Sequence, residues 1–231
     1  MHIVPRWLMR AMIASPDTGR QTERDRMVED QIVSRGTKNP AVLRAMRAVP
    51  RHEFIPGPQS SLAYEDQPLP IGYGQTISQP AVVAFMTEAL NLSGAEKVLE
   101  VGTGSGYQAA VLAEIVAKVF TIEIIEPLAS RATETLARLG YRNVQVRAGD
   151  GSEGWAEEAP FDAIIVTAAS DPLPQPLLDQ LAIGGRLIAP VGKTHQTLVL
   201  VRRTHGGYER TELLAVLFVP LTGNTRSQPS R

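Results

Sequence analysis

The amino-acid sequence predicts an α/β fold built on a doubly wound, mostly parallel sheet. From residue 94 onward, apolar runs alternate with amphipathic helical patterns, as expected for a parallel sheet covered on both faces. A glycine-rich turn follows the first apolar run, and acidic residues follow the next two, which is where such sheets bind ligands. The segment before residue 94 predicts a helical cap, and the β-rich segments after residue 192 predict antiparallel strands at the sheet edge.

Composition limits the class of protein. With 231 residues, 43% of them hydrophobic, the chain is long enough for one large α/β domain. A formal charge of −1, a pI of about 6.4 and scattered basic residues favour neither nucleic acid nor an anionic membrane as partner. The absence of cysteine excludes disulfides, thiolate metal sites and cysteine nucleophiles. The four histidines lack metal-ligand spacing, so we expect no metal site.

Neither end of the sequence resembles part of the predicted sheet. No continuous apolar stretch reaches the roughly 18 residues of a membrane span. Near the start, Arg10 interrupts a short apolar run that would otherwise suggest a signal peptide. We therefore expect residues 1–22 to be a disordered extension, residues 224–231 a polar tail, and the protein to be cytoplasmic.

The predicted cap contains two helices and a proline-rich segment. Apolar spacing predicts helices over residues 23–35, which Gly36 ends, and over residues 40–49, which Pro40 begins. Five prolines between residues 50 and 70 predict extended or turning backbone.

A polar segment, Ile-Gly-Tyr-Gly-Gln-Thr-Ile-Ser-Gln-Pro at residues 71–80, leads into a predicted helix over residues 81–92. Ser78 then lies just outside a helix N-terminus, where free N–H groups, the helix dipole and a hydroxyl can meet a carboxylate. Ser78 can equally serve as a cap for that helix. The local sequence leaves both interpretations open.

The remaining elements follow from hydrophobic periodicity. Strands are predicted at residues 97–101, 119–124, 144–148, 161–167 and 186–190, with helices at 107–117, 127–139 and 177–181. Two further strands, at 197–203 and 213–219, form the predicted antiparallel edge.

The turn after the first strand is a candidate nucleotide-binding loop. Residues 98–107 read Val-Leu-Glu-Val-Gly-Thr-Gly-Ser-Gly-Tyr, so Glu100 precedes glycines 102, 104 and 106. Glycines permit tight turns and close approach of a ligand, and the N–H groups of the following helix favour polar ligand groups. The spacing differs from the G-x-G-x-x-G of nicotinamide-binding loops, and an ordinary strand-to-helix turn remains the alternative.

The next two strands also end in polar groups. Glu123 follows Gly106 by 17 residues, a separation suited to a carboxylate that accepts both hydroxyls of a ribose. The third strand ends in Gly149-Asp150-Gly151, where an acid and a backbone N–H can meet an adenine edge. Together these strand ends favour S-adenosylmethionine over a dinucleotide as the ligand.

Five segments, taken together, resemble the protein-L-isoaspartate O-methyltransferase family: residues 71–80, 98–106, 149–155, 184–192 and 219–222. The similarity runs in order over residues 23–223, and residues 75–79 are far more specific to the family than the glycine loop. The resemblance implies a class I, Rossmann-like methyltransferase sheet with added N-terminal helices and an altered C-terminal strand order. It implies one domain, with a substrate-side cap at 23–93 and a cofactor-binding sheet at 94–223.

The resemblance also implies roles for individual residues. Ser78 matches the active-site serine, Glu123 the ribose-binding acid, and Asp150 with Gly151 the adenine-binding pair. Substrate-binding candidates are Thr76, Gln79, Val219 and Leu221, and further cofactor-binding candidates are Glu100, Gly102, Thr103, Gly104, Gly106 and Thr222.

The activity implied by the resemblance is methyl transfer from S-adenosyl-L-methionine to the side-chain carboxylate of L-isoaspartyl residues in damaged proteins. We expect isoaspartyl proteins and peptides as partners, no nucleic acid or membrane, and a monomer. One alternative is an S-adenosylmethionine enzyme for nucleic acid or small molecules, but residues 167–170, Thr-Ala-Ala-Ser, lack the Asn/Asp-Pro-Pro-aromatic tetrad of amino-directed enzymes. The other alternative is a non-catalytic cofactor-binding module.

Overall fold

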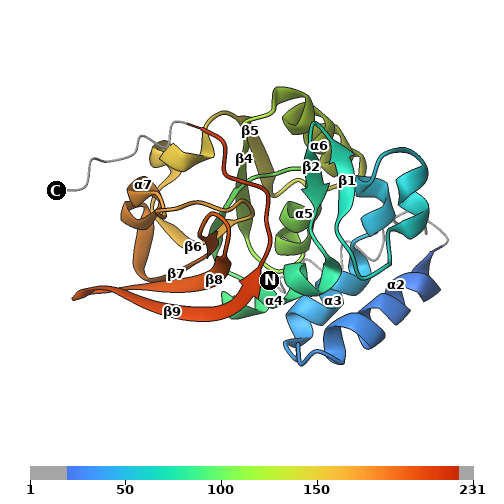
Figure 1. Cartoon of the computed structure of the whole chain (residues 1–231), viewed down its shortest axis with the longest axis horizontal. Coiled ribbons are helices and arrows are strands. Elements are labelled where there is room, and N and C mark those ends of the chain that lie inside the picture. The colour runs from blue at the N-terminus through green and yellow to red at the C-terminus, as the bar shows by residue number, and fades with distance from the viewer. Residues whose placement is uncertain (1–19, 224–231) are drawn as a thin grey trace, which may run out of the picture.

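A seven-stranded sheet forms the centre of the molecule (Figure 1). The structure is a computed structural model that describes residues 20–223; most of the predicted extension, residues 1–19, and the whole predicted tail lie outside the described residues. In spatial order the strands are β5 (Val144–Ala148), β4 (Lys118–Glu123), β3 (Lys97–Val101), β6 (Phe161–Val166), β7 (Leu181–Val191), β8 (Gln196–Thr204) and β9 (Gly207–Val216).

The first five of these strands are parallel, as predicted. In β3, residues 98 to 101 are all buried, and in β6 so are residues 163 to 166. Strands covered on both faces read as continuous apolar runs, which is why the sequence located β3 and β6 within one residue. The predicted start of β7 at residue 186 was wrong, because this strand begins at Leu181, and its first half carries Gly184 and Gly185 instead of a continuous apolar run. The doubly wound fold class is confirmed.

Alternate residues of the strands feed two separate cores. On one face Val98, Val119 and Ile165 pack with the cap and with α5 (Tyr107–Ala113) and α6 (Glu126–Arg138). On the other face Leu99 and Phe120 pack with α7 (Gln175–Asp179) and Trp155. This alternation follows from the two-residue period of a strand.

Strands β8 and β9 form the predicted antiparallel edge. They follow β7 in chain order, so the last strand lies outermost, in agreement with the altered strand order that the resemblance implied. The predicted limits of the last strand were wrong, because β9 begins at Gly207 instead of residue 213 and ends at Val216. Almost all of β9 is exposed. Residues 207–212 carry Glu209, Arg210 and Glu212, so they have no apolar pattern that could have revealed them.

The N-terminal cap is helical, as predicted. Helix α2 (Gln21–Met27) continues into the π-helix η1 (Val28–Val33), and α3 (Pro40–Ala48) follows, capped by the Asn39 side chain. Helix α2 begins two residues inside the predicted 1–22 extension, where Arg20 pairs with Glu23 and donates to the Ser60 carbonyl. Ordered structure therefore begins before residue 23.

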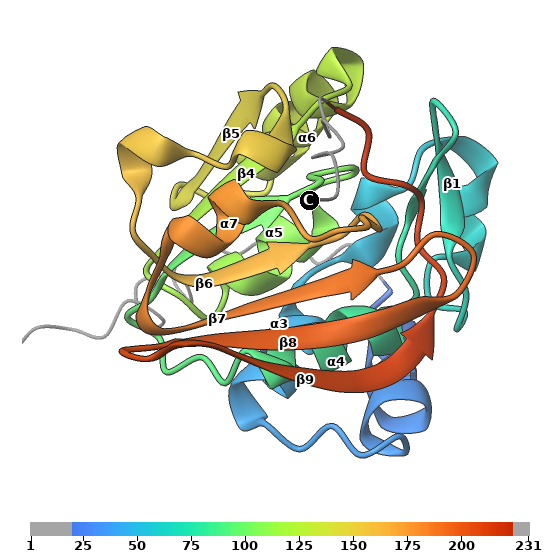
Figure 2. The same cartoon turned by 60° about the vertical axis from the view of Figure 1, so that its left-hand side comes forward.

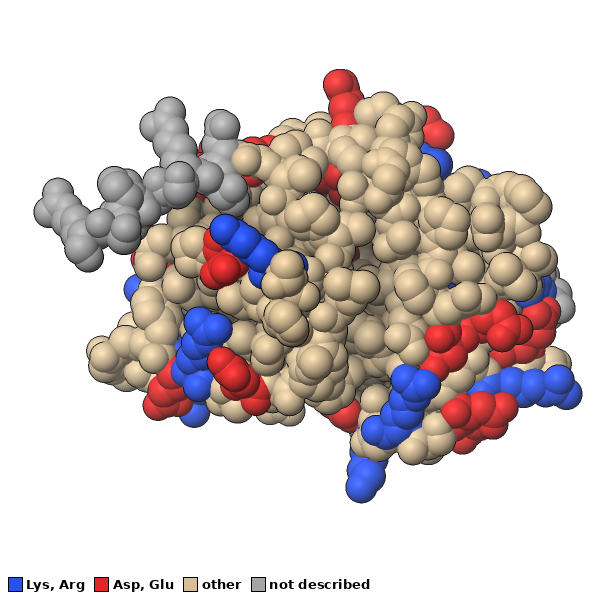
Figure 3. Space-filling model, viewed as in Figure 1, with Lys and Arg blue, Asp and Glu red and all other residues tan. Residues whose placement is uncertain are grey.

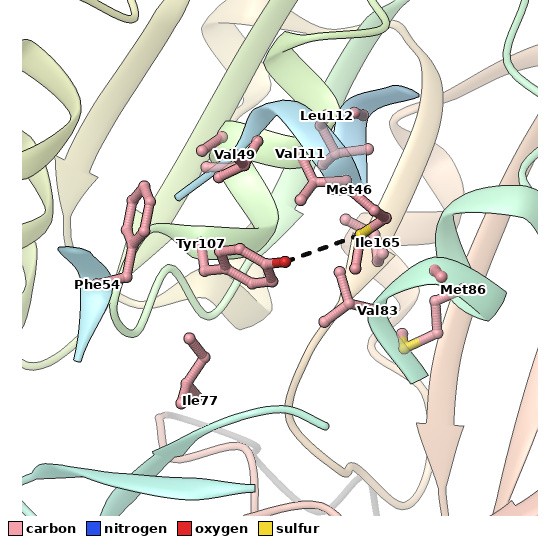
Figure 4. Close-up of a cluster of buried hydrophobic side chains, with 14 of the residues drawn as sticks. Met46, Val49, Phe54, Ile77, Val83, Met86, Tyr107, Val111, Leu112 and Ile165 are labelled. Carbon is pink, nitrogen blue, oxygen red and sulfur yellow. Dashed lines mark hydrogen bonds between the residues drawn. The ribbon is translucent and has the colours of Figure 1, made fainter. Parts of the chain in front are cut away.

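The proline-rich segment folds as two short 3₁₀ helices, η2 (Arg51–Phe54) and η3 (Gly57–Leu62), where the sequence predicted extended or turning chain. Proline suits a helix start, and Pro58 occupies such a position in η3. Between cap and sheet, Phe54 packs edge-on against Tyr107, and Tyr107 donates to the sulfur of Met46 (Figure 4). This cluster attaches the cap to the first turn of α5.

A β-hairpin, which the sequence did not predict, precedes α4 (Pro80–Ala89). Strands β1 (Leu69–Gly72) and β2 (Gln75–Ile77) are joined by a turn with positive φ at Gly72, Tyr73 and Gly74. Arg131 of α6 donates to the Ile71 carbonyl and so holds the hairpin beside the sheet. Figure 2 shows the hairpin opposite the ends of the strands, with the chain after β9 passing between them.

Gly106 provides a test of the packing between α5 and α6. Its φ is +89°, and an added Cβ would lie 3.3 Å from both Ala132 and Leu136, which are buried in α6. Gly140 is a matched control, since its φ is +81° but nothing lies within 4 Å of an added Cβ.

We expect Gly140→Ala to lower the free energy of unfolding by about 1–2 kcal/mol through its backbone angle alone. Gly106→Ala should lower it by about 1–3 kcal/mol more, through overpacking. Urea unfolding measures the free energy of unfolding of both variants. Equal losses of stability in Gly106→Ala and Gly140→Ala would contradict close packing of α5 against α6 at Gly106.

Candidate active site

A cleft opens at the carboxyl ends of β3, β4 and β6, where the winding of the sheet reverses between β3 and β6. This is the place where doubly wound sheets bind ligands. Its other walls are the end of the β1–β2 hairpin and residues 219–222. We call residues 219–223 the C-terminal strap. On the face viewed in Figure 3, most charged side chains lie toward the margins and the middle of the face is largely uncharged.

The glycine loop is bonded to both neighbouring strands. The amides of Gly102 and Thr103 donate to the Ile122 carbonyl of β4, and the Thr167 hydroxyl after β6 donates to the Gly102 carbonyl at 2.6 Å. A Cβ at residue 102 would lie 2.5 Å from the Thr167 oxygen. Gly102 is therefore required for this contact, independently of any ligand.

Thr167 lines the cleft, although the sequence analysis did not propose it as a site residue. Its position directly after the fourth parallel strand was the available signal. Tyr107 and Gln108, at the start of α5, also line the cleft and were not proposed.

Glu100 is completely buried beneath the loop. Thr121 donates to its Oε2 at 2.6 Å, and the hydroxyl of Thr103 lies 2.6 Å from that of Thr121. Its Oε1 is buried and has no hydrogen-bond partner among the described residues, although Glu100 lines the cleft. The pKa of Glu100 is raised to about 8, chiefly by burial and to a smaller extent by the nearby Glu123 carboxylate, against the opposing effect of the Thr121 hydrogen bond.

Glu123 ends β4 with its carboxylate fixed in the cleft. Its Oε2 accepts from the Gly104 amide at 2.8 Å, and its Oε1 accepts from the Ile125 amide at 2.9 Å. A carboxylate offers about four acceptor positions, so two remain for a ligand that carries two hydroxyls. The same side chain also sets the position of the glycine loop.

Gly151 follows β5 and lines the cleft, and a Cβ there would lie 2.5 Å from Val101. The side chain of Asp150 accepts from the amide and the hydroxyl of Ser152. Gly223, at the end of the strap, lies directly against this carboxylate, since an added Cβ would come within 2.3 Å of its Oδ1. Asp150 thus lies at the border of the cleft beneath the end of the strap.

Ser78 and Thr76 line the opposite wall of the cleft. The N-cap of α4 is Gln79, and no side chain caps this helix. The Gln79 carbonyl accepts from the amides of Val82 and Val83. The interpretation of Ser78 as a cap is therefore not supported, and Ser78 is instead one of the residues that line the cleft.

The strap crosses the cleft between two points of attachment. At its start, the Gln196 side chain bonds both the amide and the carbonyl of Phe218. Ala169 then accepts from the Leu221 amide and donates to the Val219 carbonyl. Residues 219–222 are consequently held over the ends of the strands.

Most of the predicted site residues come together in this cleft. Those that line it are Thr76, Ser78, Glu100, Gly102, Thr103, Gly104, Glu123, Gly151, Val219, Leu221 and Thr222. Three do not: Gln79 serves as a helix N-cap, Gly106 packs against α6, and Asp150 lies at the border.

The chain matches the family model of protein-L-isoaspartate(D-aspartate) O-methyltransferase over residues 22–226. It belongs to this family. A protein-L-isoaspartate O-methyltransferase of Picosynechococcus sp. is 55% identical over 202 residues, which cover 87% of this chain and 91% of the relative. One of Gloeobacter violaceus is 58% identical over 198 residues, covering 85% and 97%.

Solved structures of the same family share the fold. One named protein-L-isoaspartate O-methyltransferase is 29% identical with a TM-score of 0.80, over 88% of this chain and 66% of that one. A structure from Plasmodium falciparum named for the same activity, in complex with S-adenosyl-L-homocysteine, is 26% identical with a TM-score of 0.76, over 86% and 98%.

Two further features concern only residues 20–223. No helix in this range is long and apolar enough to cross a membrane. No group of three or more His, Asp or Glu side chains in the same range could hold a metal ion.

The buried Glu100 carboxyl predicts a distinct pH dependence of stability. Between about pH 5 and 8 the folded protein keeps a proton that the unfolded chain releases, so the free energy of unfolding falls as pH rises. The slope from this one group is about 1.4 kcal/mol per pH unit. Glu100→Gln has no such proton to lose.

Urea unfolding of both proteins at several pH values between 5 and 8 measures the effect. The wild type should lose stability relative to Glu100→Gln as pH rises, whereas Glu126→Gln, at an exposed position on α6, should run parallel to the wild type. Parallel curves for Glu100→Gln would contradict the raised pKa.

Proposed function

We propose that this protein transfers a methyl group from S-adenosyl-L-methionine to the side-chain carboxylate of L-isoaspartyl residues in damaged proteins and peptides. Besides membership of the family, one structural observation supports the proposal: Ser78 lines the same cleft as the glycine loop and Glu123. Donor and acceptor groups can therefore be bound side by side.

The cleft suits an S-adenosylmethionine cofactor. Glu123 keeps two acceptor positions for ribose hydroxyls. Glu100 Oε1 is a buried polar atom without a hydrogen-bond partner among residues 20–223, as expected of a group that meets a ligand. Gly151, with Asp150 beside it, is the candidate for the adenine end, and the glycine loop with Thr103 for the methionine end. When bound, the cofactor supplies a methyl group on a positively charged sulfur.

The acceptor needs orientation more than activation. A carboxylate with an ordinary pKa near 4 is already ionised at neutral pH, so no general base is required. Ser78 is the candidate to hold the carboxylate by hydrogen bonding, with Thr76 and Gln79 on one side and Val219 and Leu221 on the other as candidates to hold the peptide backbone. Holding two reactants in line accounts for large accelerations without acid–base chemistry.

An ester carbonyl accepts a nucleophile far more readily than a carboxylate does. The backbone nitrogen of the next residue therefore attacks it, methanol leaves, and the succinimide closes without the enzyme. Hydrolysis of the succinimide returns part of the material to a normal aspartyl linkage. The cleft therefore needs to do only the first step of the repair. The cytoplasmic location and the monomeric state remain predictions.

Methylation of matched peptides tests the proposal. Labelled S-adenosylmethionine is incubated with the protein and with two peptides that differ only in having isoaspartate or aspartate at one position. Base-labile label on the isoaspartyl peptide alone is the expected result. Cofactor binding without transfer would support a non-catalytic module, and label on nucleic acid or small molecules would support another kind of methyltransferase.

The proposed role of Ser78 predicts a separation of binding from turnover. Ser78→Ala should lower the single-turnover rate about 10- to 100-fold, the effect of one hydrogen bond to a charged group, while cofactor affinity stays within about twofold. Ser61→Ala, an exposed serine on η3, is the control and should change neither quantity. An equal loss of rate and of cofactor affinity would count against this role.

A further inference from the structure

A second hollow lies beside the cleft, between the cap, α4 and β9. Its apolar lining comes from Ile32 of η1, from Ala81, Val82 and Phe85 of α4, and from Leu214 of β9. Its volume is about 210 Å³. An apolar cavity of about 150 Å³ is large enough for benzene, so this pocket can hold the side chain of a leucine or phenylalanine.

Two segments of the chain contribute residues both to the pocket and to the cleft. In the first turn of α4, Val83 lines the cleft, whereas the neighbouring Ala81 and Val82 line the pocket. In the other segment, Leu214 lines the pocket and Val219 lines the cleft. Five residues of extended chain cover roughly 17 Å, so a polypeptide parallel to this segment needs about five residues to pass from one site to the other.

A β-bulge places Leu214 beside the pocket. Thr197 of β8 pairs with Ala215, and Val199 pairs with Glu212, so Leu213 and Leu214 together oppose the single residue between them on β8. Bulges redirect side chains and are frequent at sheet edges near active sites. Leu213 and Leu214 both remain more than one-third exposed to solvent.

The outer edge of β9 is open within the described part of the chain, because the sheet ends there. Open edges are usually protected by charged side chains. The half of β9 near the turn has them, at Glu209, Arg210 and Glu212, but residues 213–218 carry no charge. The half without charged residues is the one that leads into the cleft.

The two polar residues that line the pocket, Arg35 and Thr37, already have partners within the protein, so they do not need a charged or polar ligand. Arg35 is already paired with Asp66, and the amide of Thr37 donates to the Ile32 carbonyl. The remaining lining is apolar, so the occupant that fits is an uncharged, apolar group.

We propose that this pocket binds an apolar side chain of the substrate polypeptide, four to six residues from the isoaspartyl residue, while the polypeptide lies extended along residues 214–221. The inference rests on the proposed function, since it extends the same cleft. An extended chain can pair with the backbone of an open strand edge, and a pocket beside the edge then selects one side chain. The enzyme thereby prefers damaged sites in unfolded segments that carry a nearby apolar residue.

A peptide series tests the proposal. Each peptide has one isoaspartate in a Gly/Ser/Thr background, with a single leucine moved through positions one to seven on either side, and an all-polar peptide serves as reference. One position, four to six residues away on one side only, should lower KM about tenfold with kcat unchanged, the effect of burying most of one leucine side chain.

Two variants locate the effect. Leu214→Asp places a charge at the pocket and should abolish the tenfold preference. Ile183→Asp is the matched control, because Ile183 is an exposed large apolar residue of β7 outside the pocket and should keep the full preference. The all-polar peptide reports in each variant whether the cleft still works.

The outcomes separate the two proposals. A wild type that methylates every isoaspartyl peptide equally well overturns the pocket and leaves the proposed function intact. A wild type that methylates none of them overturns the proposed function. A leucine preference that survives Leu214→Asp also overturns the proposed role of the pocket. So does a dimer that Leu214→Asp dissociates without changing peptide selectivity, because a second copy of the chain then occupies the pocket.

Discussion

The contact between Gly102 and Thr167 is the constraint on which the rest of the site depends. It allows the Thr167 hydroxyl to bond the Gly102 carbonyl and so joins the end of β6 to the loop after β3, while the Ile122 carbonyl joins the same loop to β4. With the loop fixed, the Gly104 amide meets Glu123, and α5 starts where Tyr107 can hold the cap. The glycine loop is thus connected to β6 through Thr167, to β4 through the Ile122 carbonyl, and through α5 to the cap.

Two kinds of segment close the cleft from outside the sheet. The β1–β2 hairpin brings Thr76 and Ser78, and the strap brings Val219 to Thr222. The sheet with its loop is the part shared by doubly wound nucleotide-binding folds. In the proposed function the ends of the strands, with Thr222 of the strap, bind the donor, whereas the hairpin and residues 219 and 221 of the strap bind the acceptor.

The sequence predicted what depends on local burial and on parallel topology. Strands β3 and β5 were located within their limits, and strand ends brought Glu100, Glu123 and Gly151 to one edge because parallel strands share it. Residues 207–212 of β9 and the three-residue β2 were missed, since neither segment carries an apolar period. Contacts between distant segments, such as Gly223 against Asp150, could not be predicted, because nothing in the local sequence of either residue encodes the other.

The central claim is that one cleft holds the methyl donor and the isoaspartyl carboxylate side by side. A crystal structure of the complex with S-adenosyl-L-homocysteine and an isoaspartyl peptide tests it most directly. The account predicts ribose hydroxyls on Glu123, the peptide carboxylate within hydrogen-bond distance of Ser78, and the cofactor sulfur facing that carboxylate. A peptide bound away from Ser78, or a cofactor away from the ends of β3 and β4, would contradict it.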